Sequence, residues 1–176
     1  MSDIAKTAGT TDILTSDDDS QQQYLTFVLA GEEYGVDILR VQEIKGWDAV
    51  TKIPNTPEYI RGVINLRGII VPIIDMRSRF GLEELKYGPT TVVILLKVEN
   101  EEAVVRTMGV VVDAVSDVHN VPVDEIKASP DFGSAVDTEF VRGLATVNGK
   151  MVIVLDIDHM LNTDELVSLE ENVGEE

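Results

Sequence analysis

Residues 61–75 read RGVINLRGIIVPIID and residues 142–156 read RGLATVNGKMVIVLD, so one pattern occurs twice in the chain. Five of the fifteen positions are identical: Arg-Gly at the start, a central Gly, a Val three residues later and a final Asp. In each copy two apolar runs flank a short turn. Asn148-Gly149 is typical of a type I′ turn, because both residue types tolerate positive φ. Each copy therefore predicts a β-hairpin, with Arg67 at the tip of the first one.

A second correspondence lies upstream of each hairpin. Residues 35–44 align with residues 109–118: Gly35-Val36 matches Gly109-Val110, and Glu43-Ile44 matches Asp117-Val118. The two matches together indicate two copies of one five-strand unit, each too small to bury a core alone. The sequence thus predicts an all-β fold with short helices, built from two packed five-stranded β-barrels that share an apolar core.

Short apolar runs and turn signals place the other strands. Residues 24–29 and 34–38 flank a Gly-containing turn and predict a hairpin. Residues 69–74 and 92–98 are nearly all apolar, which is typical of strands buried on both faces. In residues 41–44, Val41 and Glu43 alternate with Gln42 and Ile44, so a regular strand turns one of these pairs outward. The sequence does not decide which pair that is.

Helices are few in this reading. Residues 122–127 suit one or two helical turns. Asp156 is placed to cap a helix over residues 157–161, and Thr163 to cap another over residues 164–171, with acids favourably near its N-terminus.

The composition excludes several functional classes. The 176 residues include no Cys and only two His, which excludes thiolate metal sites, a Cys nucleophile and a His-based catalytic metal site. A net charge of −18 opposes binding to nucleic acid or anionic lipid. No apolar run approaches the roughly 18 residues needed to span a bilayer, and no secretory signal is present. We expect a cytoplasmic protein without cofactors.

The charge is unevenly distributed. Residues 1–23 carry a net −4 and residues 157–176 a net −7, whereas residues 40–86 are slightly basic at +2. The first of these segments is polar and predicts a flexible acidic tail over residues 1–22. The basic stretch stands out as a candidate contact surface in an otherwise acidic chain.

Catalytic patterns are missing. There is no phosphate-binding Gly-rich motif and no nucleophile elbow, and the paired acids lie in predicted turns. An RNA-binding barrel would need a basic groove with exposed aromatic residues, but aromatic residues make up only 5% of the chain. The remaining interpretation is a protein that acts through its surface.

Several motifs together resemble the CheW-type chemotaxis coupling proteins. The resemblance covers roughly residues 22–165 and rests on segments from both halves of the chain: Gly31–Ile38, Val41–Ile44, Ile53–Pro57, Ile60–Gly68, Val71–Asp75, Gly109–Asp113 and Val115–Val118. It implies SH3-like barrels and no catalysis. It also implies a CheW-like domain over residues 23–165, with a first barrel at about 23–88, a second at 89–157, a C-terminal helix at 158–170 and an acidic tail at 171–176.

The resemblance further implies a non-enzymatic adaptor. Its partners would be the cytoplasmic tips of methyl-accepting chemoreceptors and the regulatory domain of the chemotaxis histidine kinase, in arrays associated with the membrane. The alternative is a regulatory CheW-like module of a larger chemotaxis protein. Matched position by position, the receptor-binding residues of the family fall on Val41, Glu43, Ile44, Gly62, Asn65, Leu66, Arg67 and Val118. The kinase-contact residues are not placed by the resemblance.

Overall fold

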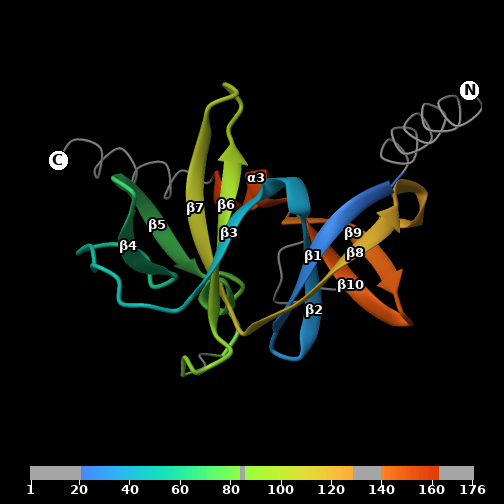
Figure 1. Cartoon of the computed structure of the whole chain (residues 1–176), viewed down its shortest axis with the longest axis horizontal. Coiled ribbons are helices and arrows are strands. Elements are labelled where there is room, and N and C mark those ends of the chain that lie inside the picture. The colour runs from blue at the N-terminus through green and yellow to red at the C-terminus, as the bar shows by residue number, and fades with distance from the viewer. Residues whose placement is uncertain (1–20, 84–85, 129–139, 163–176) are drawn as a thin grey trace, which may run out of the picture.

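The computed structural model describes residues 21–83, 86–128 and 140–162, and it contains two five-stranded sheets side by side (Figure 1). The first sheet has the order β8-β1-β2-β10-β9, and the second has the order β3-β6-β7-β5-β4. The first sheet consists of β1 (Gln21–Leu29), β2 (Glu32–Asp37), β8 (Ala114–Pro122), β9 (Val141–Val147) and β10 (Lys150–Leu155). The second consists of β3 (Val41–Gly46), β4 (Ile60–Leu66), β5 (Ile69–Asp75), β6 (Val92–Glu99) and β7 (Val105–Val112).

Short helices accompany the sheets in the described residues. They are the 3₁₀ turns η1 (Ile38–Arg40) and η2 (Val123–Glu125) and the α-helices α2 (Met76–Arg79) and α3 (Ile157–Leu161). The carboxylate of Asp156 accepts a hydrogen bond from the His159 N–H and caps α3, which confirms that predicted helix. The helix expected at residues 164–171 lies outside the described residues.

The two sheets are not contiguous halves of the chain, so the expected division near residue 88 is wrong. Residue 88 falls between β5 and β6, which belong to the same sheet. The chain crosses from the first sheet to the second after β2, and it returns after β7. The first sequence repeat comprises β1–β5 and the second comprises β6–β10. The two repeats exchange their opening hairpins, because β1–β2 joins the sheet of β8–β10 and β6–β7 joins the sheet of β3–β5.

The repeat itself is confirmed in detail. Reading from β3 and from β8, the strands of the two sheets correspond one to one in position and direction. A parallel pair joins the hairpins in both sheets, with Ile73 opposite Gly109 in one and Val154 opposite Gly35 in the other. The predicted 148–149 turn is also present, with φ of 51° at Asn148 and 79° at Gly149.

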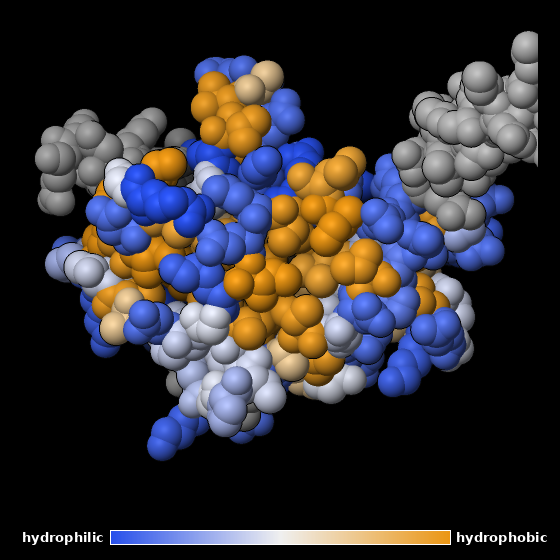
Figure 2. All heavy atoms as spheres, viewed as in Figure 1, coloured by the Kyte–Doolittle hydropathy of each residue, from blue (hydrophilic) through white to orange (hydrophobic). Residues whose placement is uncertain are grey.

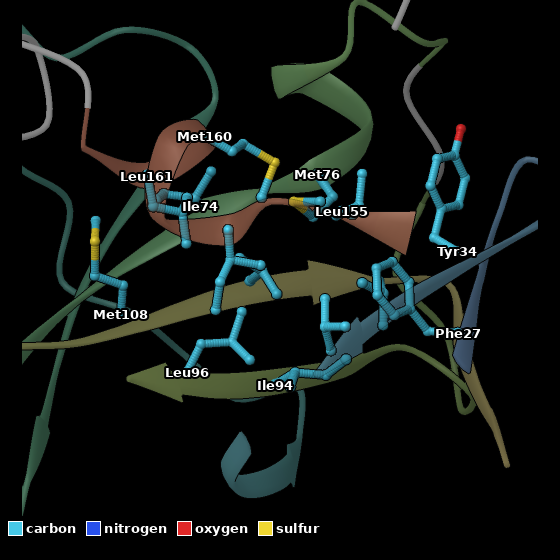
Figure 3. Close-up of a cluster of buried hydrophobic side chains, with 14 of the residues drawn as sticks. Phe27, Tyr34, Ile74, Met76, Ile94, Leu96, Met108, Leu155, Met160 and Leu161 are labelled. Carbon is cyan, nitrogen blue, oxygen red and sulfur yellow. The ribbon is translucent and has the colours of Figure 1, made fainter. Parts of the chain in front are cut away.

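One large apolar core lies between the sheets (Figure 3). Phe27, Tyr34 and Leu155 enter it from the first sheet, while Ile74, Ile94, Leu96 and Met108 enter from the second. Met160 and Leu161 of α3, both fully buried, join the same cluster. A smaller cluster around Ile73, Val93 and Leu95 belongs to the second sheet alone, and another around Tyr24 and Val154 belongs to the first.

The prediction that residues 69–74 and 92–98 form strands buried on both faces is largely confirmed. In β6, Val93 and Leu95 enter the cluster of the second sheet, and Ile94 and Leu96 enter the shared core. In β5 the prediction is confirmed for residues 71–74, but Ile69 and Ile70 are exposed beside the β4–β5 turn.

A largely buried ion pair between Arg77 and Asp113 links the two sheets where the chain crosses from β7 to β8. Both oxygens of Asp113 accept hydrogen bonds from the Arg77 guanidinium at 2.7 Å, and one also accepts from the Ala30 N–H at 2.9 Å. Arg77 belongs to α2 and Ala30 to the β1–β2 turn. Burial by itself would raise the pKa of the Asp113 carboxyl, but these hydrogen bonds and the charge of Arg77 hold it below its ordinary value.

This ion pair predicts how stability depends on pH. Because the pKa of Asp113 is depressed in the folded chain, its contribution is present above the unfolded value of about 3.9 and is lost as the pH falls through the folded value. We expect Asp113→Asn to lower the free energy of unfolding by about 1–3 kcal/mol at neutral pH. Urea titrations of both proteins measure this difference.

The same difference should shrink once the pH falls below the folded pKa of the Asp113 carboxyl, because the carboxyl is then protonated in both the folded and the unfolded chain. A difference of equal size above and below that pKa would contradict the assignment of the effect to the Asp113 charge.

Candidate functional site

The strands β3 and β4 are the two edges of the second sheet, and they approach each other through two ties. At one end, the N–H of Thr51 donates to the Val63 carbonyl and the N–H of Val63 donates to the Thr51 carbonyl, both at 2.9 Å. At the other end, the Arg67 guanidinium lies 3.1 Å from the Glu43 carboxylate. We call the space between these ties, bounded by residues 43–51 and 63–67, the seam.

The seam contains a hollow of about 230 Å³. Its floor is formed by Ile73 and Val93, both buried and both members of the apolar cluster of the second sheet. Its lining mixes polar and apolar side chains and comprises Lys45, Gly46, Asp48, Ala49, Val50, Thr51, Val63, Ile64, Asn65, Ile73 and Val93. Concave sites with convergent polar groups are the usual candidates for binding sites.

The β4–β5 turn orients Arg67 toward the seam. Asn65 accepts a hydrogen bond from the Gly68 N–H at 2.8 Å, and Arg67 and Gly68 both have positive φ, 51° and 88°. This is the hairpin tip expected for Arg67. The side chain remains 67% exposed while it pairs with Glu43, so the pair is a surface ion pair open to a partner.

Two residues of the predicted receptor-binding set are buried parts of the frame. Leu66 packs into the apolar cluster of the second sheet. Gly62 lies directly beneath the Thr51–Val63 tie at φ +146°, where a Cβ would collide with the Thr51 carbonyl oxygen. The equivalent Gly143 lies beneath a matching tie between Lys127 and Leu144, where a Cβ would be 2.6 Å from the Lys127 oxygen. Both glycines of the repeated Arg-Gly motif therefore leave room for the segment that follows one edge strand to approach the opposite edge strand of the same sheet.

A β-bulge changes the predicted alternation along β3. Val41 lies opposite Leu96 and Glu43 lies opposite Leu95, so Gln42 is an extra residue. Ile44 then lies opposite Ile94 and shares a face with Val41, contrary to simple period-2 reasoning. Val41 is half-buried against the shared core, whereas Ile44 is 43% exposed. Figure 2 shows apolar surface across the middle of this face, where β3 passes between the sheets.

Val118 does not join the other predicted residues. It lies on β8 in the first sheet, opposite Leu25, at the position that corresponds to Ile44. Like Ile44 it is exposed, at 41%. The same bulge precedes it, between the pairs Val115–Phe27 and Val118–Leu25. The structure thus brings Glu43, Asn65 and Arg67 together at the seam and leaves Val118 at the equivalent place on the other sheet.

Sequence reasoning missed a buried polar network behind the seam. Asp75 is almost fully buried; it caps α2 through the Ser78 N–H, pairs with Arg61 at 3.1 Å and contacts the Tyr87 hydroxyl. Burial and then the Asp75 carboxylate raise the pKa of the Tyr87 hydroxyl. Trp47, which follows β3, packs edge-on against the Tyr87 ring. The final Asp of the repeated motif was the available signal, because a capping role explains its recurrence in both copies.

Among residues 21–83, 86–128 and 140–162, no cluster of three or more His, Cys, Asp or Glu side chains is arranged to hold a metal ion. No helix in this described part of the chain is long and apolar enough to cross a membrane.

Comparison with known proteins decides the family. Residues 23–165 match the family model described as CheW-like domain. The chain belongs to this family. It is 45% identical over 153 residues to the chemotaxis protein CheW of Klebsiella aerogenes, a match that spans 87% of this chain and 89% of that protein.

More distant members and a solved structure agree. Chemotaxis protein CheW of Rhizobium meliloti is 33% identical over 144 residues, which span 82% of this chain and 90% of the relative. The crystal structure of the scaffolding protein TtCheW from Thermoanaerobacter tengcongensis superimposes with a TM-score of 0.72 at 35% identity. That match covers 82% of this chain and 90% of the other. The two-sheet, mostly β architecture is therefore that of the CheW family.

The geometry at Gly62 makes a prediction about stability. We expect Gly62→Ala to lower the free energy of unfolding by about 1–3 kcal/mol, because the added Cβ overpacks against the Thr51 carbonyl and the positive φ disfavours Ala. Gly46→Ala is the control, since a Cβ there meets nothing within 4 Å; it should change stability by no more than about 0.5 kcal/mol. Equal stability of the two variants in urea denaturation would contradict the role of Gly62 in the tie.

Proposed function

We propose that the chain is a non-enzymatic adaptor that couples methyl-accepting chemoreceptors to the chemotaxis histidine kinase, so that the state of the receptor controls the activity of the kinase. Membership of the CheW-like family supports this role. The observation that carries it is the seam, where Glu43, Asn65 and Arg67 meet beside a hollow within the slightly basic stretch of an acidic chain.

The proposed receptor surface divides its residues into two roles. Glu43, Ile44, Asn65 and Arg67 are exposed or partly exposed and would contact the receptor, whose tip is expected to be a helical hairpin. Val41, Gly62 and Leu66 are buried or half-buried and would maintain the shape of the surface. Val118, on the first sheet, would make a separate contact. An apolar helix face could lie on Ile44, with Arg67 available to a receptor carboxylate.

Each five-stranded sheet is proposed to be an SH3-like barrel. The matched ties at Thr51–Val63 and Lys127–Leu144 support this idea, because each links the continuation of one edge strand to the opposite edge of its sheet. The kinase regulatory domain would bind barrel surfaces away from the seam. The adaptor would reach the membrane-associated array through these protein contacts, without cofactors and without insertion into the bilayer.

The coupling role is tested by reconstitution. Membranes that contain receptor are mixed with purified kinase, with and without this protein, and kinase autophosphorylation is measured with and without attractant. We expect receptor control of the kinase only when the protein is present. Unchanged kinase activity on omission of the protein would contradict the proposed function.

The receptor surface predicts the effect of two substitutions. Arg67→His and Glu43→Lys should each weaken binding to a receptor-tip fragment at least tenfold, because each breaks the exposed ion pair at the edge of the seam while leaving the buried clusters intact. Isothermal titration calorimetry measures the affinity, and circular dichroism verifies the fold. Lys150→His, at the start of β10 beside the equivalent turn of the first sheet, is the control and should bind like the original chain. Unchanged affinity in folded Arg67→His would remove Arg67 from the surface.

A further inference from the structure

The hollow in the seam exists because the two edge strands are tied only at its ends. Between the Thr51–Val63 hydrogen bonds and the Arg67–Glu43 ion pair, β3 and β4 are not partners in the sheet, since they occupy opposite ends of its strand order. The hollow therefore lies directly above the apolar cluster of the second sheet. Ile73 and Val93 lie at its floor and are buried, with exposed fractions of 0% and 5%.

The size of the hollow suits a side chain better than a metabolite. Sites that enclose small ligands measure about 300–1,000 Å³, whereas an apolar cavity of about 150 Å³ already accommodates benzene. At about 230 Å³ the hollow is large enough for one leucine, methionine or phenylalanine side chain. The partly exposed side chains of Val50, Val63 and Ile64 in its lining give such a side chain a favourable transfer from water.

The charges on the rim define what should accompany that side chain. Arg67 is already paired with Glu43, and Asp48 accepts a hydrogen bond from the N–H of its neighbour Ala49. Lys45 forms no ion pair with any residue in the described part of the chain. A carboxylate on the bound segment would therefore find its cation in Lys45.

We propose that the hollow receives one large apolar side chain that projects from the receptor helix, next to an acidic residue that pairs with Lys45. This inference rests on the proposed function. Asn65 belongs both to the proposed receptor surface and to the rim, so a helix on that surface passes directly over the opening. A second copy of this chain is the less suitable occupant, because two chains of net charge −18 repel each other.

Nuclear magnetic resonance of the full chain tests occupancy directly. The methyl groups of Ile73 and Val93 are labelled, and a purified cytoplasmic-tip fragment of a methyl-accepting chemoreceptor is added. These methyl groups are buried at the floor, so we expect their resonances to shift only if a side chain enters the hollow. Shifts at Ile44 without shifts at Ile73 and Val93 would overturn the inference and leave the proposed function standing. Absence of binding by the original chain would count against the proposed function itself.

Substitutions that fill the hollow give an independent test. Val63→Phe and Ala49→Leu each add bulk to its wall, and we expect each to weaken binding of the receptor-tip fragment at least tenfold. Ala49 is exposed, so Ala49→Leu keeps the test valid if Val63→Phe fails to fold. Leu144→Phe changes the position equivalent to Val63 on the first sheet and should bind normally. If Arg67→His weakens binding and Ala49→Leu does not, the hollow is not the receptor's anchor point.

Discussion

The apolar core between the two sheets is the interaction on which the rest of the structure depends. Strand β6 shows why, since its side chains alternate between the cluster of its own sheet and the core shared with the other sheet. Burial of one large apolar side chain contributes about 1.5–3 kcal/mol, and one face of β6 stays in water unless the first sheet and α3 cover it. In the described residues, each sheet therefore covers the apolar face that the other sheet turns toward the shared core.

Because the hairpins are exchanged, the two sheets are connected by the polypeptide chain as well as by apolar contacts. Because β1–β2 belongs to the first sheet and β3–β5 to the second, the chain passes between the sheets twice, and the Asp113–Arg77 pair fastens one of these crossings. The frame is nearly symmetric, but its surface is not. Glu43 and Arg67 form an ion pair in the second sheet, whereas the corresponding Asp117 and Asn148 cannot. The repeat provides the same scaffold twice, and substitution at a few exposed positions gives one copy a distinct chemistry.

The sequence predicted features that depend on local chemistry. Asn148-Gly149 has the φ preference of its turn, Asp156 has the side chain that caps α3, and the repeated Arg-Gly motif marks equivalent places in two sheets. Other features depend on tertiary contacts that no local pattern encodes. The extra residue Gln42 puts Ile44 on the same face as Val41, which simple alternation does not predict, and the boundary near residue 88 fails because adjacent hairpins exchange sheets. The seam and its hollow arise only when two strands distant in sequence become neighbours.

The exchanged topology also has a consequence for synthesis on the ribosome. Strand β2 ends at Asp37, but its parallel partner β10 begins at Lys150, so the first sheet has a high contact order. At about 5–20 residues per second, the N-terminal hairpin leaves the ribosome roughly 6–23 s before its partner strand is made. During this interval the second sheet can already pair its own five strands, which are contiguous in the chain. The first sheet cannot be completed until β10 is made, so in that interval the core face of the second sheet lacks its full cover.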